Sequence, residues 1–269
     1  MGAKPARFSP RPAISHVVFD FDGTLSWLRH GWPELMAGLF LKHESNAQAP
    51  RKEVIHHQLL DDILSLNGKS SIYQMQRCSE RVIENGGPKL DPQEMLAQYQ
   101  AALEQSIAQR KEKIKRGEAA PDEFVVHGAR ALLQRFQARG LVLVILSGTV
   151  QEQVKEEAEL LGLTQFFGPH IYGSTRDLLG SSKQAVIERL MRQEQIAGEH
   201  LLSFGDGPVE IRLTKQAGGL AVGVASDEDH NGSGTQHPQK VQLLQEAGAD
   251  LLIPDYRQPD KLVKSLLGS

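Results

Sequence analysis

The sequence predicts an α/β protein with a doubly wound, parallel, Rossmann-like sheet and an inserted all-helical domain. Short apolar runs without polar alternation recur along the chain, which is typical of strands buried on both faces of a parallel sheet. Helical patterns separate these runs between residues 125 and 255, so strands and helices alternate as in doubly wound folds. The interval 27–122 contains no comparable strand run, and its patterns predict helices.

The expected elements of the core follow one another in a regular order. Turn residues bound each apolar run, and an amphipathic pattern of helical period follows most of them. The strands are expected at 17–21, 141–146, 201–204, 221–224 and 251–253, with a weaker one near 170–172. The helices are expected at 129–138, 151–161, 183–192, 209–217 and 260–267.

These elements divide the chain into three parts. Residues 1–13 are basic and rich in proline, and we expect a flexible N-terminal arm. Residues 14–26 and 123–269 form the predicted α/β core, and residues 27–122 form the helical insertion. The polar stretch 226–239 within the core is expected to be a long surface loop.

Composition and charge restrict the class of protein. A net charge of −3 over 269 residues argues against a nucleic-acid binder, which usually concentrates basic charge. No apolar run approaches the length of a membrane span, so no membrane partner is expected. The single cysteine, Cys78, excludes an intrachain disulfide and favours a reducing compartment. We therefore expect a cytoplasmic protein. We expect it to be a monomer or a homodimer.

The first expected strand ends in two aspartates, in the segment "HVVFDFDGTLS" at 16–26. Asp20 should emerge at the carboxyl edge of the sheet, where open α/β sheets bind ligands, and Asp22 follows past the strand end. Gly23 allows a tight turn and a close backbone approach. Two carboxylates this close repel each other unless a cation or a shared proton relieves them. Mg²⁺ suits the pair, because it binds one or two carboxylates together with waters and phosphate oxygens.

The segment "DFDGTLS" resembles the first signature of the haloacid dehalogenase superfamily, in its phosphatase branch. The resemblance implies that Asp20 attacks phosphorus and becomes an aspartyl-phosphate, and that Asp22 is the general acid and base. This is covalent catalysis in two displacements, with proton transfer at the leaving oxygen. It also implies a Mg²⁺ ion bound by Asp20 and by the backbone carbonyl of Asp22.

The second and third signatures of the superfamily resemble later segments in the expected order. The segment "LVLVILSGT" supplies Ser147 and Gly148 after a strand, where a hydroxyl and N–H groups at a helix start can bind phosphate. The segment "LGSSKQAVIERL" supplies Lys183, which by resemblance neutralises Asp20 and the transferred phosphoryl group. A cation at a helix N-terminus opposes the macrodipole, so local stability does not explain Lys183.

The fourth signature is an acidic pair after another strand, and "LLSFGDGPVEI" resembles it. The resemblance implies that Asp206 is a further metal ligand, directly or through water. Glu210 could hold a metal-bound water or orient Lys183. The superfamily often has aspartate at this second place, so the glutamate leaves both roles open.

The helical insertion at 27–122 lies where the family places a helical C1-type cap, which by resemblance carries substrate specificity. Arg29 and Lys69 are expected to contact an anionic or hydroxylated substrate such as a sugar phosphate.

The leading hypothesis is thus a Mg²⁺-dependent phosphatase that hydrolyses a small phosphomonoester, of the sugar-phosphate or phosphoglycolate type, through an aspartyl-phosphate. A phosphosugar mutase shares the paired aspartates and the helical cap, and it stays open. A phosphonate hydrolase would need a Schiff-base lysine in the cap. A non-catalytic binding module would be expected to lack at least one of the four signatures.

Overall fold

The computed structural model describes residues 8–43, 49–67, 69–174 and 183–268. The chain forms two compact units. Met1–Leu28 with Ile114–Ser269 is called the core unit, and Arg29–Lys113 is called the helical unit. The chain enters the helical unit close to the expected boundary at 26/27. It leaves that unit earlier than the expected boundary at 122/123, within helix α4.

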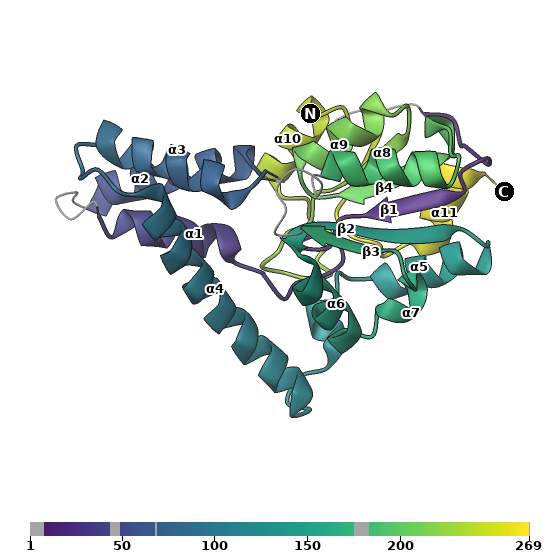
Figure 1. Ribbon diagram of the computed structural model, residues 1–269, viewed down its shortest axis with the longest axis horizontal. Coiled ribbons are helices and arrows are strands. Elements are labelled where there is room, and N and C mark those ends of the chain that lie inside the picture. The colour runs from purple at the N-terminus through teal and green to yellow at the C-terminus, as the bar shows by residue number, and fades with distance from the viewer. Residues whose placement is uncertain (1–7, 44–48, 68, 175–182, 269) are drawn as a thin grey trace. The chain divides into compact units, whose positions relative to one another are not determined.

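The core unit contains a six-stranded sheet in the order β3-β2-β1-β4-β5-β6 (Figure 1). Every neighbouring pair is parallel. This confirms the predicted doubly wound α/β class. The strands are β1 His16–Phe19, β2 Val142–Val150, β3 Ile171–Ser174, β4 Leu201–Gly205, β5 Leu220–Val224 and β6 Leu251–Ile253.

The strand order reverses between β1 and β4, which lie side by side in the sheet. Phe19 at the end of β1 is in register with Phe204, the residue before the last of β4. The chain segments that follow the two strands, at 20–23 and at 206–207, therefore leave the same edge of the sheet together. Ligands of open α/β sheets bind at such a switch point, outside the carboxyl ends of the strands.

Helices cover both faces of the sheet (Figure 1). Val17 and Phe19 of β1 pack in one apolar cluster with side chains of α5, α6 and α11. Val18, which points to the opposite face, packs with side chains of α8. The helices of this unit are α5 Ala129–Ala138, α6 Gln151–Leu160, α7 Thr164–Phe167, α8 Lys183–Gln193, α9 Pro208–Gln216, α10 Pro238–Glu246 and α11 Pro259–Leu267.

Two differences from the expected elements bear on the site. Strand β2 continues to Val150, past the expected end at 146, and its pairing with β3 shifts register between Leu146 and Val150. The stretch 226–239 is not only a surface loop: Ser226 is buried, and helix α10 begins at Pro238. The helical pattern of α10 is short and follows a polar loop, which hid it in the sequence.

The helical unit has its own apolar core. Its helices are α1 Trp32–Leu41, α2 Ala49–Ser65, α3 Ser71–Glu84 and most of α4 Pro92–Lys115. Phe40, Leu59 and Met75 are fully buried in this core beside Cys78. Burial raises the pKa of the Cys78 thiol to about 12, so this cysteine is a packing residue and not a thiolate nucleophile.

The chain leaves and re-enters the core unit through two hydrogen-bonded segments. The N–H of Trp27 donates to the carbonyl of Phe124 at 2.8 Å, and the N–H of Val126 donates to the carbonyl of Leu25 at 3.0 Å. A bridge between Ser26 and Val125 lies between these two bonds. The ends of the inserted stretch are thus joined to each other within the core unit.

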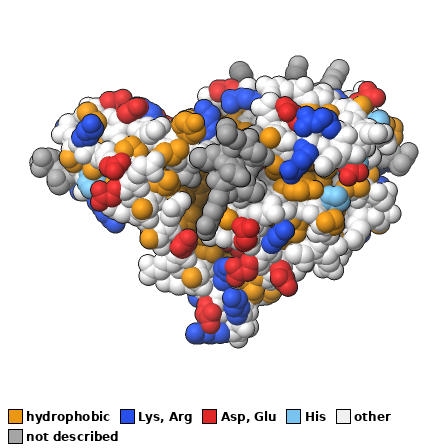
Figure 2. All heavy atoms as spheres, in the orientation of Figure 1, with side chains coloured by type: hydrophobic (Ala, Val, Ile, Leu, Met, Phe, Trp, Pro, Cys, Tyr) orange, Lys and Arg blue, Asp and Glu red, His pale blue; other side chains and the backbone are white. Residues whose placement is uncertain are grey.

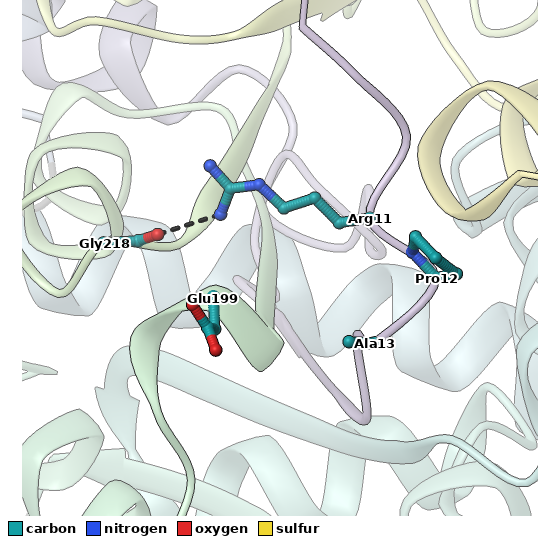
Figure 3. A pocket seen from close by; sticks show the side chains of 5 residues that line it. All are labelled: Arg11, Pro12, Ala13, Glu199 and Gly218. Atoms are coloured by element: carbon teal, nitrogen blue, oxygen red, sulfur yellow. Dashed lines mark hydrogen bonds between the residues drawn. The ribbon is translucent and has the colours of Figure 1, made fainter.

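The last part of the expected N-terminal arm lies against the core unit. The N–H of Arg11 donates to the carbonyl of Leu266 at 2.7 Å, and its guanidinium donates to the carbonyl of Gly218 at 2.8 Å. Arg11, Pro12 and Ala13 line a pocket of about 470 Å³ together with Glu199 and Gly218 (Figure 3). The rest of the arm, residues 1–7, lies outside the described residues.

Candidate active site

Asp20 is the first residue after β1, and its carboxylate is held on one oxygen. Its N–H continues the ladder to β4 by donating to the carbonyl of Phe204 at 2.9 Å. Oδ1 accepts from the N–H of Phe21 at 2.8 Å and from Nζ of Lys183 at 2.9 Å. Burial raises the pKa of Asp20 well above its ordinary value, although Lys183 opposes the shift. Both donors found among the described residues use Oδ1, so Oδ2 is the oxygen that a ligand would contact.

Lys183 joins two of the carboxylates of the site. It is the first residue of α8, it is buried, and its Nζ also contacts a carboxylate oxygen of Glu210. Burial alone would lower the pKa of Lys183, but the charges of Asp20 and Glu210 outweigh it, so its pKa is raised and it stays an ammonium. Of the two roles left open for Glu210, the contact with Lys183 is thus present in the structure.

Asp206 follows β4 and faces the turn that contains the paired aspartates. Burial raises the pKa of its buried carboxyl to about 6, although Lys240 opposes the shift. Gly23 lies so close that a Cβ at this position would stand 2.3 Å from Oδ2 of Asp206. Gly23 also has a φ of 73°, a left-handed conformation that favours glycine. The glycine therefore brings the turn after β1 against the carboxylate after β4.

Replacing Gly23 with alanine should lower both stability and metal binding, because the new Cβ must displace Asp206. The matched control is G140A, because Gly140 has a φ of 72° and nothing within 4 Å of its Cβ position. G140A reports the backbone strain alone, which is of order 1–2 kcal/mol. Chemical denaturation should show a clearly larger loss of unfolding free energy in G23A. Equal losses in the two variants would contradict the close contact.

The carboxylate of Asp22 is oriented by hydroxyl groups of β2. Its Oδ2 accepts from Oγ1 of Thr149 at 2.8 Å and from Oγ of Ser147 at 3.3 Å. The N–H of Thr149 donates to Oγ of Ser147 at 3.0 Å. Thr149 was not singled out in the sequence, although residues two apart on a strand share a face, which was the available signal.

The expected phosphate-binding residues lie within a strand, whereas the sequence placed them after its end. Ser147 and Gly148 belong to strand β2, and helix α6 begins only at Gln151. The helix thus begins where the sequence predicts it, but the strand before it is longer than expected and includes both residues, with a register shift against β3 between Leu146 and Val150. Gly148 is exposed, with nothing within 4 Å of its Cβ position, so its backbone is open to a ligand.

Lys240 and Glu228 were missed by the sequence reading. Nζ of Lys240 donates to Oδ2 of Asp206 at 3.0 Å and also to Oε1 of Glu228. Burial alone would lower the pKa of Lys240, but the charges of Glu228 and Asp206 raise it. A signal was present: Lys240 stands in the first turn of α10, where a cation opposes the helix macrodipole, as it does at Lys183.

The two expected substrate contacts belong to the other unit. Arg29 and Lys69 both lie in the helical unit, Arg29–Lys113. Lys69 is exposed, in the turn after α2, where its N–H donates to the carbonyl of Leu66 at 3.1 Å. Within the core unit, Lys183 contacts Asp20 and Glu210. Lys240 contacts Asp206.

The donor set fits a hard divalent cation. In the described part of the chain, no group of three or more acidic, histidine or cysteine side chains forms a ready metal cage. Asp20 and Asp206 are nevertheless buried oxygen donors, and Oε2 of Glu210 is buried without a hydrogen-bond partner among the described residues. Mg²⁺ is bound by just such a small carboxylate set, with waters and phosphate oxygens completing the octahedron. Asp20, Asp206 and the backbone carbonyl of Asp22 would hold it.

A parallel sheet with acidic and lysine side chains at the switch point defines an α/β enzyme whose site lies at the carboxyl edge of β1 and β4. The model of the haloacid dehalogenase-like hydrolases matches residues 14–218. The chain belongs to this family of hydrolases, as the sequence signatures predicted. The family generally uses a divalent metal ion.

Solved structures with a similar fold cover nearly the whole chain. A conserved haloacid dehalogenase-like protein of unknown function from Agrobacterium tumefaciens is 15% identical, with a TM-score of 0.64, covering 93% of this chain and 97% of that one. A predicted phosphoglycolate phosphatase from Haemophilus somnus is 15% identical, with a TM-score of 0.62, covering 93% and 98%. A β-phosphoglucomutase from Clostridium difficile is 14% identical, with a TM-score of 0.57, covering 91% and 92%. No curated protein matches the chain.

The helices and the surface of the molecule have two further properties. None of the helices in the described residues is both long and apolar enough to cross a membrane. Acidic and basic side chains are intermixed on the face shown in Figure 2, in line with the small net charge.

Proposed function

We propose that this hydrolase is a Mg²⁺-dependent phosphatase that cleaves a small phosphomonoester through an aspartyl-phosphate. The observation that carries the proposal is the arrangement around Asp20. Its Oδ1 is fixed by Lys183 and by the N–H of Phe21, and the hydroxyl-bound carboxyl of Asp22 follows two residues later. These contacts, at the carboxyl edge of the sheet, support Asp20 as the proposed nucleophile and Asp22 as the proposed proton-transfer group.

The proposed reaction proceeds in two displacements. In the first, Oδ2 of Asp20 attacks phosphorus, the ester P–O bond breaks, and the leaving alkoxide takes a proton from Asp22. In the second, Asp22 takes a proton from water as the water oxygen attacks phosphorus. The bond between phosphorus and Asp20 then breaks, which releases phosphate and restores both carboxyl groups.

Several groups of the chain would stabilise the transferred phosphoryl group. Lys183 lies next to the nucleophile, and its ammonium can offset charge on the phosphoryl oxygens. Ser147 would supply a hydroxyl, and the exposed Gly148 would supply its backbone N–H. The metal ion, when bound, supplies further charge neutralisation at these oxygens.

The substrate class we propose is a small organic phosphate, such as a sugar phosphate or a phosphoglycolate-like acid. Arg29 and Lys69 are proposed to contact its organic moiety. Support comes from the solved structures of similar fold, one of which is described as a predicted phosphoglycolate phosphatase.

A panel of phosphate esters tests this function. We expect phosphate release from a narrow subset of sugar, polyol, nucleotide and phosphoglycolate-type esters in Mg²⁺. EDTA should abolish that release and added Mg²⁺ should restore it, because the carboxylates of the site need the cation to bind the phosphoryl dianion. Phosphorus NMR of the same reactions identifies the products. Conversion of a sugar phosphate into an isomer, with no free phosphate, would identify a mutase instead. No reaction with any ester would contradict both.

A further inference from the structure

Lys240 is a buried cation outside the four sequence segments that resemble the family signatures. It lies in the first turn of α10, and its side chain is 6% exposed. A cation in the first turn opposes the helix macrodipole, and its burial removes a charge from water. Neither helix stability nor solvation explains the position, so the explanation must lie in what its ammonium contacts.

The ammonium of Lys240 contacts one carboxylate of the site and one carboxylate outside it. Nζ lies 3.0 Å from Oδ2 of Asp206, and it also donates to Oε1 of Glu228 in the loop before α10. The ring of Trp27 lies beside the ammonium, with its centroid 6.0 Å from Nζ. The ammonium of Lys240 is therefore fixed by Glu228 and Trp27, and it can orient the carboxylate of Asp206.

Asp206 is fixed on its other side by the turn after β1. The backbone at Gly23 approaches its carboxylate so closely that no side chain fits between them. With Gly23 against it and Lys240 bonded to Oδ2, the Asp206 carboxylate has one defined orientation. A metal ligand gains affinity from this kind of support, because neighbouring hydrogen bonds orient the ligating oxygens.

We propose that Lys240 and Glu228 form a charge-neutral clamp that orients Asp206 for the divalent metal ion. The inference rests on the proposed function only in taking Asp206 as a metal ligand. Lys240 holds Oδ2, which would leave Oδ1 to ligate the ion. Glu228 balances the ammonium, so that the clamp does not repel the cation it prepares the site for. Lys240 is in this sense a positioning residue.

The clamp predicts metal selectivity as well as affinity. Mg²⁺ requires a near-ideal octahedron with short bonds, whereas Ca²⁺ accepts longer bonds and variable geometry. A loosened Asp206 should therefore weaken Mg²⁺ binding more than Ca²⁺ binding. Loss of stability alone would not change the ratio of the two affinities.

The test measures metal binding directly, without turnover. Bound Mn²⁺ is titrated by electron paramagnetic resonance, and Mg²⁺ and Ca²⁺ are added as competitors to the full-length wild type, K240M, E228Q and K215M. K240M should weaken Mg²⁺ binding by about tenfold or more and lower the Mg²⁺/Ca²⁺ affinity ratio. E228Q should weaken both ions alike, since the geometry is kept while the ammonium is left unbalanced. K215M removes a lysine of the same unit that pairs with Asp250 at 2.6 Å, and it should bind like the wild type.

Specific results would overturn the inference. A folded K240M with the wild-type Mg²⁺ affinity and ratio would do so, as would equal losses in K240M and K215M. If circular dichroism shows that K240M does not fold, E228Q decides, and wild-type affinity in E228Q overturns the clamp. Phosphate release is assayed separately. If the wild type binds Mg²⁺ but cleaves no ester, the proposed function is contradicted and the clamp is not. If the wild type is active and K240M binds metal ions as the wild type does, only the clamp is contradicted.

Discussion

Phosphate release should fall by a factor on the order of 10⁴ to 10⁶ when Asp20 is replaced with asparagine, because an amide cannot form the acyl-phosphate. The fold should survive, since the amide oxygen can still accept from Lys183 and from the N–H of Phe21, as Oδ1 does at 2.9 and 2.8 Å. The measurement is steady-state phosphate release with saturating Mg²⁺ and the best ester of the panel.

A matched control and a second readout make the Asp20 result specific. D260N removes the same charge at an exposed carboxylate of α11 that pairs with Arg135 at 2.6 Å, and it should keep full turnover. Mass spectrometry of acid-quenched wild type should find a phosphoryl group on the peptide that contains Asp20. Substantial turnover in D20N, or a phosphoryl group on another peptide, would remove Asp20 from the nucleophile role.

Replacing Lys183 with methionine should abolish turnover and destabilise the protein by about 3–5 kcal/mol, because it leaves buried carboxylates without their cation. Nζ of Lys183 bonds to Asp20 at 2.9 Å and also to Glu210, and all three side chains are buried. Urea unfolding of the variant and the wild type gives the difference in unfolding free energy.

The destabilisation in K183M should depend on pH in a definite direction. Burial already raises the pKa of Asp20 well above its ordinary value, and Lys183 opposes that shift, so its loss should raise the pKa further. The folded variant then binds a proton more readily than the unfolded chain. Its stability therefore rises as pH falls through the folded pKa, and its deficit is largest at high pH.

The control for this pH dependence is K215M, which breaks the partly exposed pair with Asp250. Such a pair contributes at most about 1 kcal/mol. The prediction fails if the stability loss in K183M is the same at every pH, or no larger than the loss in K215M. In either case, removing Lys183 does not leave an uncompensated charge on the neighbouring carboxylates.

The sheet and one side of the site could be predicted from local sequence patterns. The apolar run before Asp20 and the one before Asp206 predict buried strands, and parallel strands end at a common edge. That rule needs no knowledge of packing, and it places the two carboxylates at the same edge of the sheet, whereas the pairing of β1 with β4 is known only from the structure. Lys183 was assigned through its resemblance to the third signature, and the macrodipole argument supported it, because a cation at the start of a helix contradicts helix electrostatics.

The parts that were missed depend on contacts between distant segments. Thr149 bonds to Asp22 from the part of β2 that continues beyond Ser147, where the pairing with β3 shifts register. Lys240 carried the same electrostatic signal as Lys183, but it lies in a short helix that follows a polar loop, and this pattern suggested a solvent-exposed segment. Its partner Glu228 lies in that loop, and only the folded chain brings both to Asp206.

The hydrogen bonds that join the outgoing and returning chain have a consequence for how such a protein can change over evolutionary time. Leu25 and Trp27 are hydrogen-bonded to Val126 and Phe124, so the two ends of the inserted stretch are fixed to each other within the core unit. A longer excursion between such fixed ends adds only about 0.6 kcal/mol for each doubling of its length. The intervening helices can therefore grow, shrink or be exchanged while the α/β core keeps its fold, so the two units can vary independently of each other.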